Sequence, residues 1–374
     1  MVTRNSGISS RRIVIKVGSS TLASPDGGID REYVRSLVLQ INTLKEMGWQ
    51  PVIVSSGAIA AGVEELGLEG RPADMPTLQA AASIGQVSVL SLYAAFFAEH
   101  GTTIGQILLT RRDTAHRQSY LHARDTFERL IELGVIPIVN ENDTVAVEEI
   151  KFGDNDTLAA LVAVMIGADM AVFLTDIEGF YSADPRDDET AELLDRVTQV
   201  TDQMMAAAGP AGSAVGSGGM STKVKAAKVL MRAGIPLVVC DGRVDRVILE
   251  AAEGNPVGTF FVQGSESISA KKLWIATASN PCGEVVIDAG AREALLGHGR
   301  SLLPAGVLGV SGVFDIGDTI LLVDTEGKTV GQGLAGISAA DLDVIKGLNS
   351  TQIADVRPEV VGREVVHRDH LVIL

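Results

Sequence analysis

The 374-residue sequence predicts an α/β protein, with a three-layer αβα sandwich around a mostly parallel central sheet and a small, mostly-β C-terminal domain. Two observations predict the sandwich. Short runs that are apolar throughout alternate with helical segments, as in parallel sheets covered on both faces. Small polar residues also follow several of these runs, where strands would end. The second domain is predicted by a change in the sequence pattern after residue 282, where the apolar runs are short and separated by Gly and Asp.

Six apolar runs are predicted strands. They span residues 12–18, 51–54, 103–109, 135–139, 171–174 and 235–239. Helices are predicted between them at residues 30–47, 78–99, 118–133 and 221–233. Two more helices have one predicted end each: one ends at residue 65 and the other starts at residue 156. Residues 30–47 show the reasoning, because their apolar residues recur at helical spacing and Gly48 follows where a helix ends. In the helix from Asp156, Leu158, Leu161 and Met165 are expected to form one apolar face.

Composition limits the function classes. The net charge of −16 argues against sequence-independent binding of nucleic acid, which needs a basic face. The two cysteines, Cys240 and Cys282, form neither a disulfide framework nor a zinc motif. We expect a cytoplasmic protein without a membrane span, in which residues 1–264 form the first domain, 265–281 a linker with one short element, and 282–374 the second domain.

Ligands of open parallel sheets bind beyond the carboxyl ends of the strands. Six residues are expected there: Lys16, Gly18, Ser56, Asn140, Thr175 and Asp176. Two polar clusters, Asn140–Asp143 and Lys151–Asp156, flank one short excursion between a strand and a helix. Two turns and a helix cap would explain either cluster alone. Both together, with Lys151 between them, favour a binding site.

The segment 209–223, GPAGSAVGSGGMSTK, leads into a predicted helix. Glycines let a backbone approach a ligand closely, and a helix N-terminus offers free N–H groups to an anion. Lys223 lies in the first turn, where a cation is unfavourable for the helix dipole, so a ligand role is plausible. A flexible connector is the alternative. The order STK differs from that of a P-loop, and no G-x-G-x-x-G occurs, which argues against P-loop NTPases and Rossmann dehydrogenases.

These features indicate phosphoryl transfer, which depends mainly on positioning and charge neutralisation. Lys16 and Lys223 could hold the phosphoryl group from two sides. A carboxylate acceptor is already nucleophilic at neutral pH, so no catalytic base is needed. The histidines at 116, 122, 367 and 370 are expected to have surface roles.

The motifs KVGSS, VSSGAIAAG, VNEND, FGDND, FLTDIEGFYSADPR and GSGGMSTK, in this order, resemble the glutamate 5-kinase family of the amino acid kinase fold. The resemblance covers nearly the whole chain, because the C-terminal segment resembles a PUA domain. It implies transfer of phosphate from ATP to L-glutamate, with Mg²⁺, as the first step of proline biosynthesis. Val17 and Ser19-Ser20 differ mildly from other members.

The resemblance also implies roles for individual residues. Lys16 and Lys223 would stabilise the transferring phosphoryl group, and Asp156 would orient both lysines. Glutamate would be bound by Ser56, Asp143 and Asn155, with Gly57, Asn140 and Glu141 in the same motif set. ATP would be held by Lys16, Gly18, Thr175, Asp176 and the run Ser217, Gly218, Gly219, Met220, Ser221, Thr222 and Lys223. The metal would involve Asp154, and Lys151 completes the motif.

For partners, the resemblance implies proline as a feedback inhibitor, a homo-oligomer, and handover of the product to glutamyl phosphate reductase. Acidic residues outnumber basic ones after residue 282, so we expect a structural or regulatory role for that domain rather than RNA binding. Two alternatives remain open. One is a related kinase acting on N-acetylglutamate, aspartate, carbamate or UMP. The other is an RNA-modification or RNA-binding accessory with a degenerate kinase half.

Overall fold

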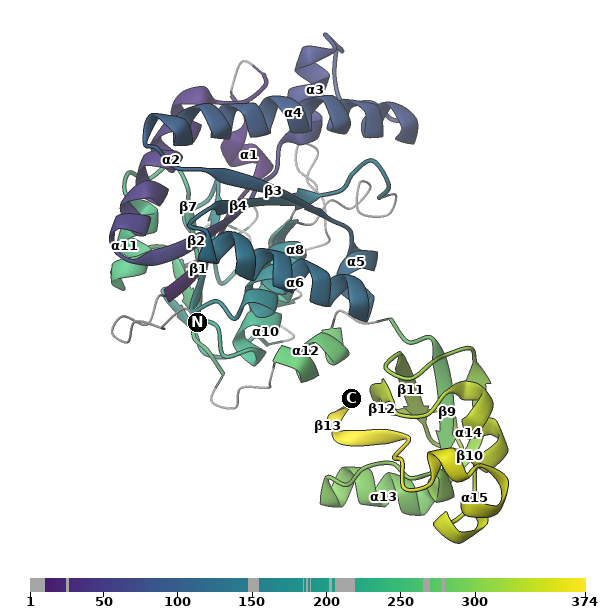
Figure 1. The fold of residues 1–374 in the computed structure, drawn as a ribbon. Helices are drawn as coiled ribbons and strands as arrows, with labels where there is room; N and C mark the ends of the chain where they lie inside the picture. The colour runs from purple at the N-terminus through teal and green to yellow at the C-terminus, as the bar shows by residue number, and fades with distance from the viewer. Residues whose placement is uncertain are drawn as a thin grey trace, which may run out of the picture. The chain divides into compact units, whose positions relative to one another are not determined.

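The computed structural model divides into two compact units (Figure 1). Unit 1 comprises Met1–Arg111 and His122–Ser267, and unit 2 comprises Arg112–Leu121 and Ile268–Leu374. The structure describes residues 11–24, 27–146, 155–183, 185, 188, 190–201, 204–205, 219–264, 270–277 and 280–374. Within the segment 265–281, helix α12 (Ala270–Thr277) belongs to unit 2.

Unit 1 is built on an eight-stranded sheet in the order β3-β4-β2-β1-β5-β7-β8-β6. The strands are β1 (Arg11–Val17), β2 (Trp49–Val54), β3 (Ile104–Leu109), β4 (Ile136–Glu141), β5 (Met170–Thr175), β6 (Arg196–Val197), β7 (Leu237–Asp241) and β8 (Thr259–Phe261). Every described strand pair of this sheet is parallel except β7–β8. The predicted mostly parallel sheet is therefore confirmed.

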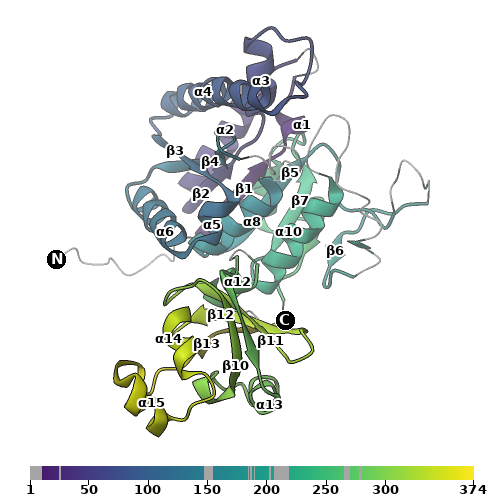
Figure 2. The ribbon, with the colours of Figure 1, turned by 90° about the vertical axis from the view of Figure 1, so that its right-hand side faces the viewer.

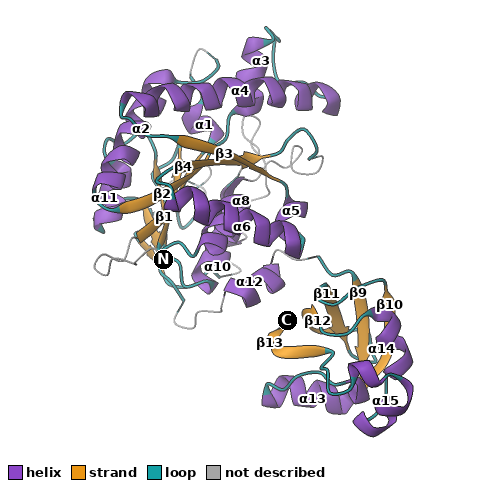
Figure 3. Cartoon of the chain, viewed as in Figure 1, coloured by secondary structure: helices purple, strands orange, loops and turns teal. Residues whose placement is uncertain are grey.

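Helices cover both faces of the sheet, which confirms the three-layer sandwich (Figure 3). The helices of unit 1 and its junctions are α1 (Ser19–Leu22), α2 (Arg31–Glu46), α3 (Ala58–Glu65), α4 (Met75–Glu99), α5 (Arg111–Ala115), α6 (Arg117–Glu132), α8 (Asn155–Ile166), α10 (Met220–Arg232) and α11 (Val247–Glu253). Ile13, Ile15 and Val17 pack with α2, α4 and α11. Side chains alternate along a strand, so Lys16 faces the opposite layer, where α8 and α10 lie side by side (Figure 2).

Helix boundaries follow local signals. The Asp30 side chain accepts a hydrogen bond from Tyr33 N and caps α2, and Gly48 follows its end with a positive φ of 86°. Helix α4 begins at Met75, earlier than expected, because Asp74 caps it in the same way. Within the described residues, α4 is the one helix long and apolar enough to cross a membrane, a test that core helices also pass. Its Tyr93 and Phe97 are fully buried in the core of unit 1.

Two expectations about the central stretch need correction. The apolar run before Asn140 was expected to end at Val139, but β4 continues through Glu141, because both added residues pair with Leu108 and Leu109 of β3. Helix α8 was expected to bury one face. Instead every residue from Leu158 to Ile166 is buried, because α8 packs both against the sheet and against the neighbouring helix α10. A helix that is apolar all round is buried all round.

Unit 2 contains a five-stranded sheet in the order β10-β9-β11-β12-β13. Its strands are β9 (Gly283–Ile287), β10 (Val307–Gly312), β11 (Thr319–Val323), β12 (Thr329–Ala335) and β13 (Val366–Ile373). The short runs expected after residue 282 contain the first four of these strands. Strand β13 was missed because polar residues interrupt its apolar pattern. Helices α13 (Ala289–His298), α14 (Ala339–Ile345) and α15 (Ser350–Val356) surround the sheet, with short 3₁₀ turns at Pro304–Gly306 and Pro358–Val360.

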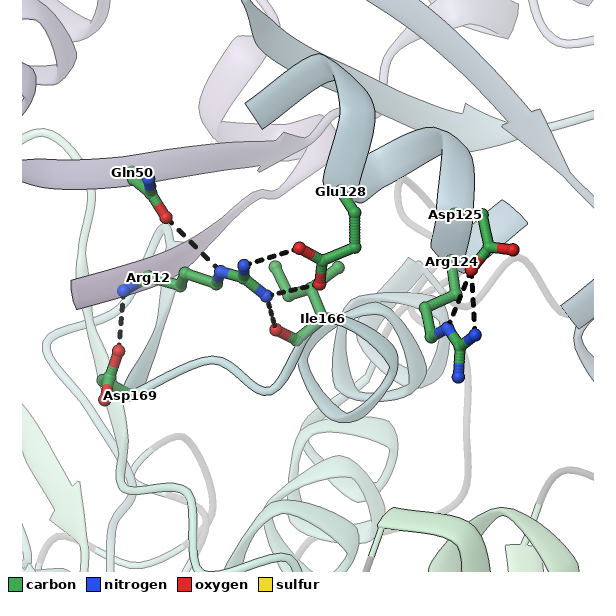
Figure 4. A network of polar contacts seen from close by, with 7 residues as sticks. All are labelled: Arg12, Gln50, Arg124, Asp125, Glu128, Ile166 and Asp169. Atoms are coloured by element: carbon green, nitrogen blue, oxygen red, sulfur yellow. Dashed lines mark hydrogen bonds and ion pairs between the residues drawn. The ribbon is translucent and has the colours of Figure 1, made fainter. Parts of the chain in front are cut away.

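Arg12 joins three elements at the amino end of the sheet in unit 1 (Figure 4). Its guanidinium makes two hydrogen bonds to Glu128 of α6, of 2.6 and 2.7 Å, and donates to the Ile166 carbonyl at the end of α8 at 2.5 Å. Its backbone N–H donates to Asp169 Oδ2 at 2.7 Å. The network therefore fixes the C-terminal end of α8. The first turn of the same helix faces Lys16, which lies on β1 together with Arg12.

Replacing Arg12 with Ala is expected to lower the free energy of unfolding of unit 1 by about 2 kcal/mol, because charge-assisted hydrogen bonds of a partly buried side chain are lost. Trp49 fluorescence during urea unfolding, in a Trp274→Phe background, measures this in unit 1 alone. Arg124→Ala removes an exposed pair with Asp125 and is the matched control. Equal urea midpoints for the two variants would contradict the expectation.

Candidate active site

The carboxyl ends of four adjacent strands, β4, β2, β1 and β5, form one edge of the sheet in unit 1. In the strand register, Lys16 lies opposite Val54 of β2 and Phe173 of β5. Ser55 and Ser56 directly follow β2, and Thr175 ends β5. The convergence of these strand ends, expected from the sequence, is present in the structure.

Asp156 lies between two lysines that come from distant parts of the chain. Its Oδ1 atom is 2.7 Å from Lys16 Nζ, and its Oδ2 atom is 3.3 Å from Lys223 Nζ. Lys16 is supplied by β1, Asp156 by the first turn of α8 and Lys223 by the first turn of α10. All three are buried, Asp156 completely and each lysine with 5–6% exposure. The structure therefore brings together the three residues that were predicted to be catalytic.

The Asp156 carboxylate is held in its ionised form. Burial alone would raise its pKa, but the ion pairs with Lys16 and Lys223 and a hydrogen bond from Thr222 outweigh burial and hold the pKa well below its usual range. Thr222 Oγ1 donates to Asp156 Oδ2 at 2.7 Å. Two cations share this carboxylate, so the cluster carries a net positive charge when both lysines are protonated. Such a cluster can stabilise an anion placed beside it.

Asn155 joins two strand ends through one side-chain amide. Its Nδ2 atom donates to the Ser55 carbonyl at 2.7 Å, to Ser56 Oγ at 3.0 Å and to Asn140 Oδ1 at 2.9 Å. Asn140 Oδ1 also accepts from the Glu141 backbone N–H. These bonds satisfy the side-chain oxygen of Asn140 and the backbone N–H of Glu141, two residues that are buried at the end of the strand. The predicted substrate residues Ser56, Asn140 and Asn155 thus form one bonded group.

The two glycines near the site have different environments. Gly57 directly precedes α3 and has a φ of 86°, so a residue with a side chain would be strained there. The Gly18 N–H donates to the Leu174 carbonyl at 3.1 Å, and a Cβ added at Gly18 would also lie 3.1 Å from that oxygen. Gly18 was expected to help hold ATP, but its backbone N–H is engaged with β5. The close approach at Gly18 is therefore between the ends of two strands.

On the other side of Lys16, Thr175 Oγ1 donates to Asp176 Oδ1 at 3.2 Å, and the Thr175 carbonyl accepts from the Gly242 N–H. Gly219 precedes the start of α10 at Met220, so Ser221, Thr222 and Lys223 lie in its first turn. Ser221 is 5% exposed. The three residues lie at the N-terminus of α10, where backbone N–H groups can bind an anion.

Four predicted site residues, Lys151, Asp154, Ser217 and Gly218, lie outside the described residues. Asp143 is partly buried and lies in the turn after β4. Across the described ranges, no three His, Cys, Asp or Glu residues form a group that could hold a metal.

Sequence reasoning missed two contributors to the site. Ser55 provides the carbonyl that receives Asn155, although only Ser56 of the Ser-Ser-Gly turn was singled out. Tyr93, fully buried on α4, lies with its hydroxyl 3.4 Å from Ser55 Oγ. Burial raises the Tyr93 pKa to about 12, so this hydroxyl is neutral and can support Ser55 by hydrogen bonding. The doubled serine at a strand end was a usable signal for Ser55, whereas Tyr93 matches an ordinary core pattern.

The chain is similar to known families and proteins. Residues 11–241 match the model of the amino acid kinase family, and residues 283–357 match that of the PUA domain. The chain is 46% identical to glutamate 5-kinase of Geobacter sulfurreducens, over 99% of this chain and 100% of that protein. It is 42% identical to glutamate 5-kinase of Caldanaerobacter subterraneus subsp. tengcongensis, over 97% of this chain and 98% of that protein. A solved UMP kinase from Bacillus anthracis is similar at 15% identity, with a TM-score of 0.44, over 68% of this chain and 96% of that structure.

Proposed function

The chain belongs to the amino acid kinase family and, within it, to the glutamate 5-kinases, and we propose from this that it phosphorylates the side-chain carboxylate of L-glutamate. ATP donates its γ-phosphoryl group, and the products are L-glutamyl 5-phosphate and ADP. The observation that supports this most strongly is the buried Lys16–Asp156–Lys223 cluster at the carboxyl edge of the sheet.

The cluster suits phosphoryl transfer to a carboxylate. Negative charge on the moving phosphoryl group is spread over its oxygens, and cations placed in advance stabilise it. Lys16 and Lys223 are fixed by their shared carboxylate, so little reorganisation is needed when the phosphoryl group arrives. The glutamate side chain has an ordinary pKa near 4.3 and is ionised at neutral pH, so it attacks without a catalytic base. Asp156 positions the two lysines and is not a proton acceptor.

The two substrates would occupy the two sides of Lys16. Ser56, Gly57, Asn140, Glu141, Asp143 and Asn155 would bind glutamate. Thr175, Asp176 and the run from Ser217 to Lys223 would hold ATP, with the N-terminus of α10 directed at its phosphates. This division is supported by the strand order, which places β4 and β2 on one side of β1 and β5 on the other.

We infer that Mg²⁺ would enter this site as a companion of ATP. Mg²⁺ usually keeps several waters and is held by one or two carboxylates together with substrate phosphates. A dedicated cluster of three protein ligands is therefore not required. We assign Asp154 as the candidate protein ligand, next to Asn155. When bound, the ion would neutralise charge on the phosphates of ATP.

Asn155→Ala is expected to raise KM for glutamate by about 10- to 100-fold, because three acceptors at the ends of β2 and β4 lose their shared donor. KM for ATP should change by less than twofold, since the nucleotide side of the site is untouched. Initial-rate kinetics with each substrate varied separately test this. Asn255→Ala, on an exposed surface residue, is the control. Equal increases in both KM values would contradict the assignment of Asn155 to the glutamate side.

The wider context is also part of the proposal. The reaction would be the first step of proline biosynthesis in the cytoplasm, with proline competing for the glutamate region. We also propose that the protein forms a homo-oligomer. Its labile product would be handed over to glutamyl phosphate reductase. The acidic composition of the PUA domain supports a structural or regulatory role over tight RNA binding.

Glutamate-dependent hydroxamate formation tests the reaction directly. Hydroxylamine traps an acyl phosphate, so the expected result is a hydroxamate that requires ATP, Mg²⁺ and L-glutamate together, and less of it when proline is added. Release of ADP should be measured in parallel with N-acetylglutamate, aspartate, carbamate and UMP. Faster turnover with any of these acceptors than with glutamate would overturn the substrate assignment.

A further inference from the structure

Unit 2 contains a cavity of about 500 Å³ lined by a concentration of basic side chains. Arg117, Lys271, Arg363, His367 and His370 line it, with one acidic residue, Glu364. They come from three separate stretches of the chain, around residues 117, 271 and 363–370, and no motif in the sequence unites them. This cavity has no part in the chemistry proposed for the sheet edge in unit 1.

Side-chain contacts hold the segments around the cavity together. Trp274 of α12 donates its indole N–H to the Thr114 carbonyl at 2.7 Å, and its ring lies 5.5 Å from that of Tyr120. Residues 112–121 therefore belong to unit 2, and they carry Arg117. The side chain of Gln332 on β12 donates to the Ile275 carbonyl of the same helix α12. The backbones that bear Arg117 and Lys271 are thus fixed to the rest of unit 2.

The basic groups lie close to one another, and three of them, Arg117, Lys271 and Arg363, have no carboxylate partner among the described residues. Lys271 Nζ donates to Nε2 of His370, and the His370 and His367 rings are 5.5 Å apart. His367 Nε2 lies 3.6 Å from Glu364 Oε2, and His367 Nδ1 lies 3.6 Å from Asp369 Oδ2.

Burial and the crowding of basic groups lower the pKa values of Lys271 and His370. Burial lowers the pKa of Lys271, the charge of Arg117 lowers it further, and Asp369 only partly opposes them. Burial also lowers the pKa of His370, and Lys271, His367 and Arg117 act in the same direction. Each cation is therefore destabilised by its neighbours. An anion in the cavity would reverse these effects, because an opposite charge at 4–6 Å favours the charged form.

We propose that this cavity of unit 2 binds a small phosphate-bearing anion. Arg and Lys side chains are the usual partners of phosphate oxygens, through charge-assisted hydrogen bonds. The volume falls in the range of small-molecule sites, roughly 300–1,000 Å³. On binding, His370 takes up a proton and donates to the phosphate. Lys271 then loses its acceptor on His370 and turns to the phosphate as well. The proposal does not depend on the reaction assigned to unit 1.

Histidine NMR on the full chain tests the site locally, so anion binding in unit 1 does not obscure it. The pKa values of the six histidines are measured in inorganic phosphate and in sodium chloride of equal ionic strength, with His367→Gln and His370→Gln used to assign resonances. In phosphate, the pKa of His370 is expected to rise by about one unit. His298, which does not line the cavity, should not change.

Lys271→Met should reduce the phosphate-dependent rise at His370 to less than half, whereas Lys346→Met, an exposed lysine paired with Asp343 in the same unit, should preserve it. Arg363→Gln is a second test that leaves α12 intact, with the same expectation as Lys271→Met. Three results would overturn the proposal: equal His370 pKa values in phosphate and chloride, an equal shift at His298, or a full shift retained in both cavity variants.

Discussion

Replacing Lys223 with Ala is expected to lower kcat by about 10³-fold, because one of two cations prepared for the transferring phosphoryl group is removed. The fold should persist, since Asp156 keeps its ion pair with Lys16 and its hydrogen bond from Thr222. KM for glutamate should change little, because a group that acts mainly in the transition state affects kcat more than ground-state binding. Steady-state kinetics of ADP release, with circular dichroism to verify folding, measure both quantities.

Lys225→Ala is the matched control. Lys225 lies two residues further along the same helix and is exposed, so its removal should leave kcat within about twofold. A Lys223→Ala enzyme with kcat within tenfold of the unaltered protein would show that Lys223 does not stabilise the phosphoryl group, and the assigned role would have to be abandoned.

Asp156→Asn is expected to cause the largest loss of stability among the changes considered. The substitution leaves two buried ammonium groups without their shared carboxylate, and breaking a buried ion pair on one side costs about 3–5 kcal/mol. Activity should fall as well, because the lysines are no longer held together. Urea unfolding followed by Trp49 fluorescence, again in the Trp274→Phe background, measures the change in unit 1.

The stability difference has a predicted pH dependence. The pKa of Asp156 is held below its ordinary value in the folded state, so the carboxylate contributes its stabilisation fully above the unfolded pKa near 3.8. That contribution is lost as the pH falls through the folded pKa. The gap between the unaltered protein and Asp156→Asn should therefore be constant from about pH 5 to 7 and narrow under acid conditions.

Asp125→Asn is the control for that comparison, since its pair with Arg124 is exposed and contributes little. If Asp156→Asn unfolds at the same urea concentration as Asp125→Asn, the buried cluster does not stabilise unit 1. A gap that widens towards acid pH would show that the Asp156 pKa is raised rather than lowered in the folded state.

Local sequence signals were sufficient for much of the fold. Apolar runs and helical periodicity identified the six main strands and their intervening helices to within a few residues, because side-chain direction repeats with the backbone of each element. Polar residues at strand ends indicated Lys16 and Asn140 as candidate site residues, and the helix predicted from Asp156 matches α8, which begins at Asn155. Where these signals were absent, elements were missed. Strand β13 alternates irregularly, and α13, α14 and α15 are short, although Asp288, Ser338 and Asn349 cap them in the usual way.

The partners of the site residues could not be read from those signals. Asn155 bonds to the Ser55 carbonyl across 100 positions of the chain, and Lys223 reaches Asp156 across 67. Such pairs depend on which strands are neighbours and on how far each helix is shifted along the sheet. A periodic pattern contains neither quantity. The resemblance to known kinases supplied expected roles, but the distances and the burial come only from the folded chain.

The sequence was thus enough to determine the fold class, and it indicated the edge of the sheet proposed to bind ligands and the residue types proposed for phosphoryl transfer. All three follow from repeats of a few residues, which act over one element at a time. Only the tertiary structure decided that Asp156 serves two lysines, that α8 is buried on every side, and that five basic groups meet in one cavity of unit 2. These features arise where elements from distant positions pack together, and their energies depend on burial and on distances that exist only after folding.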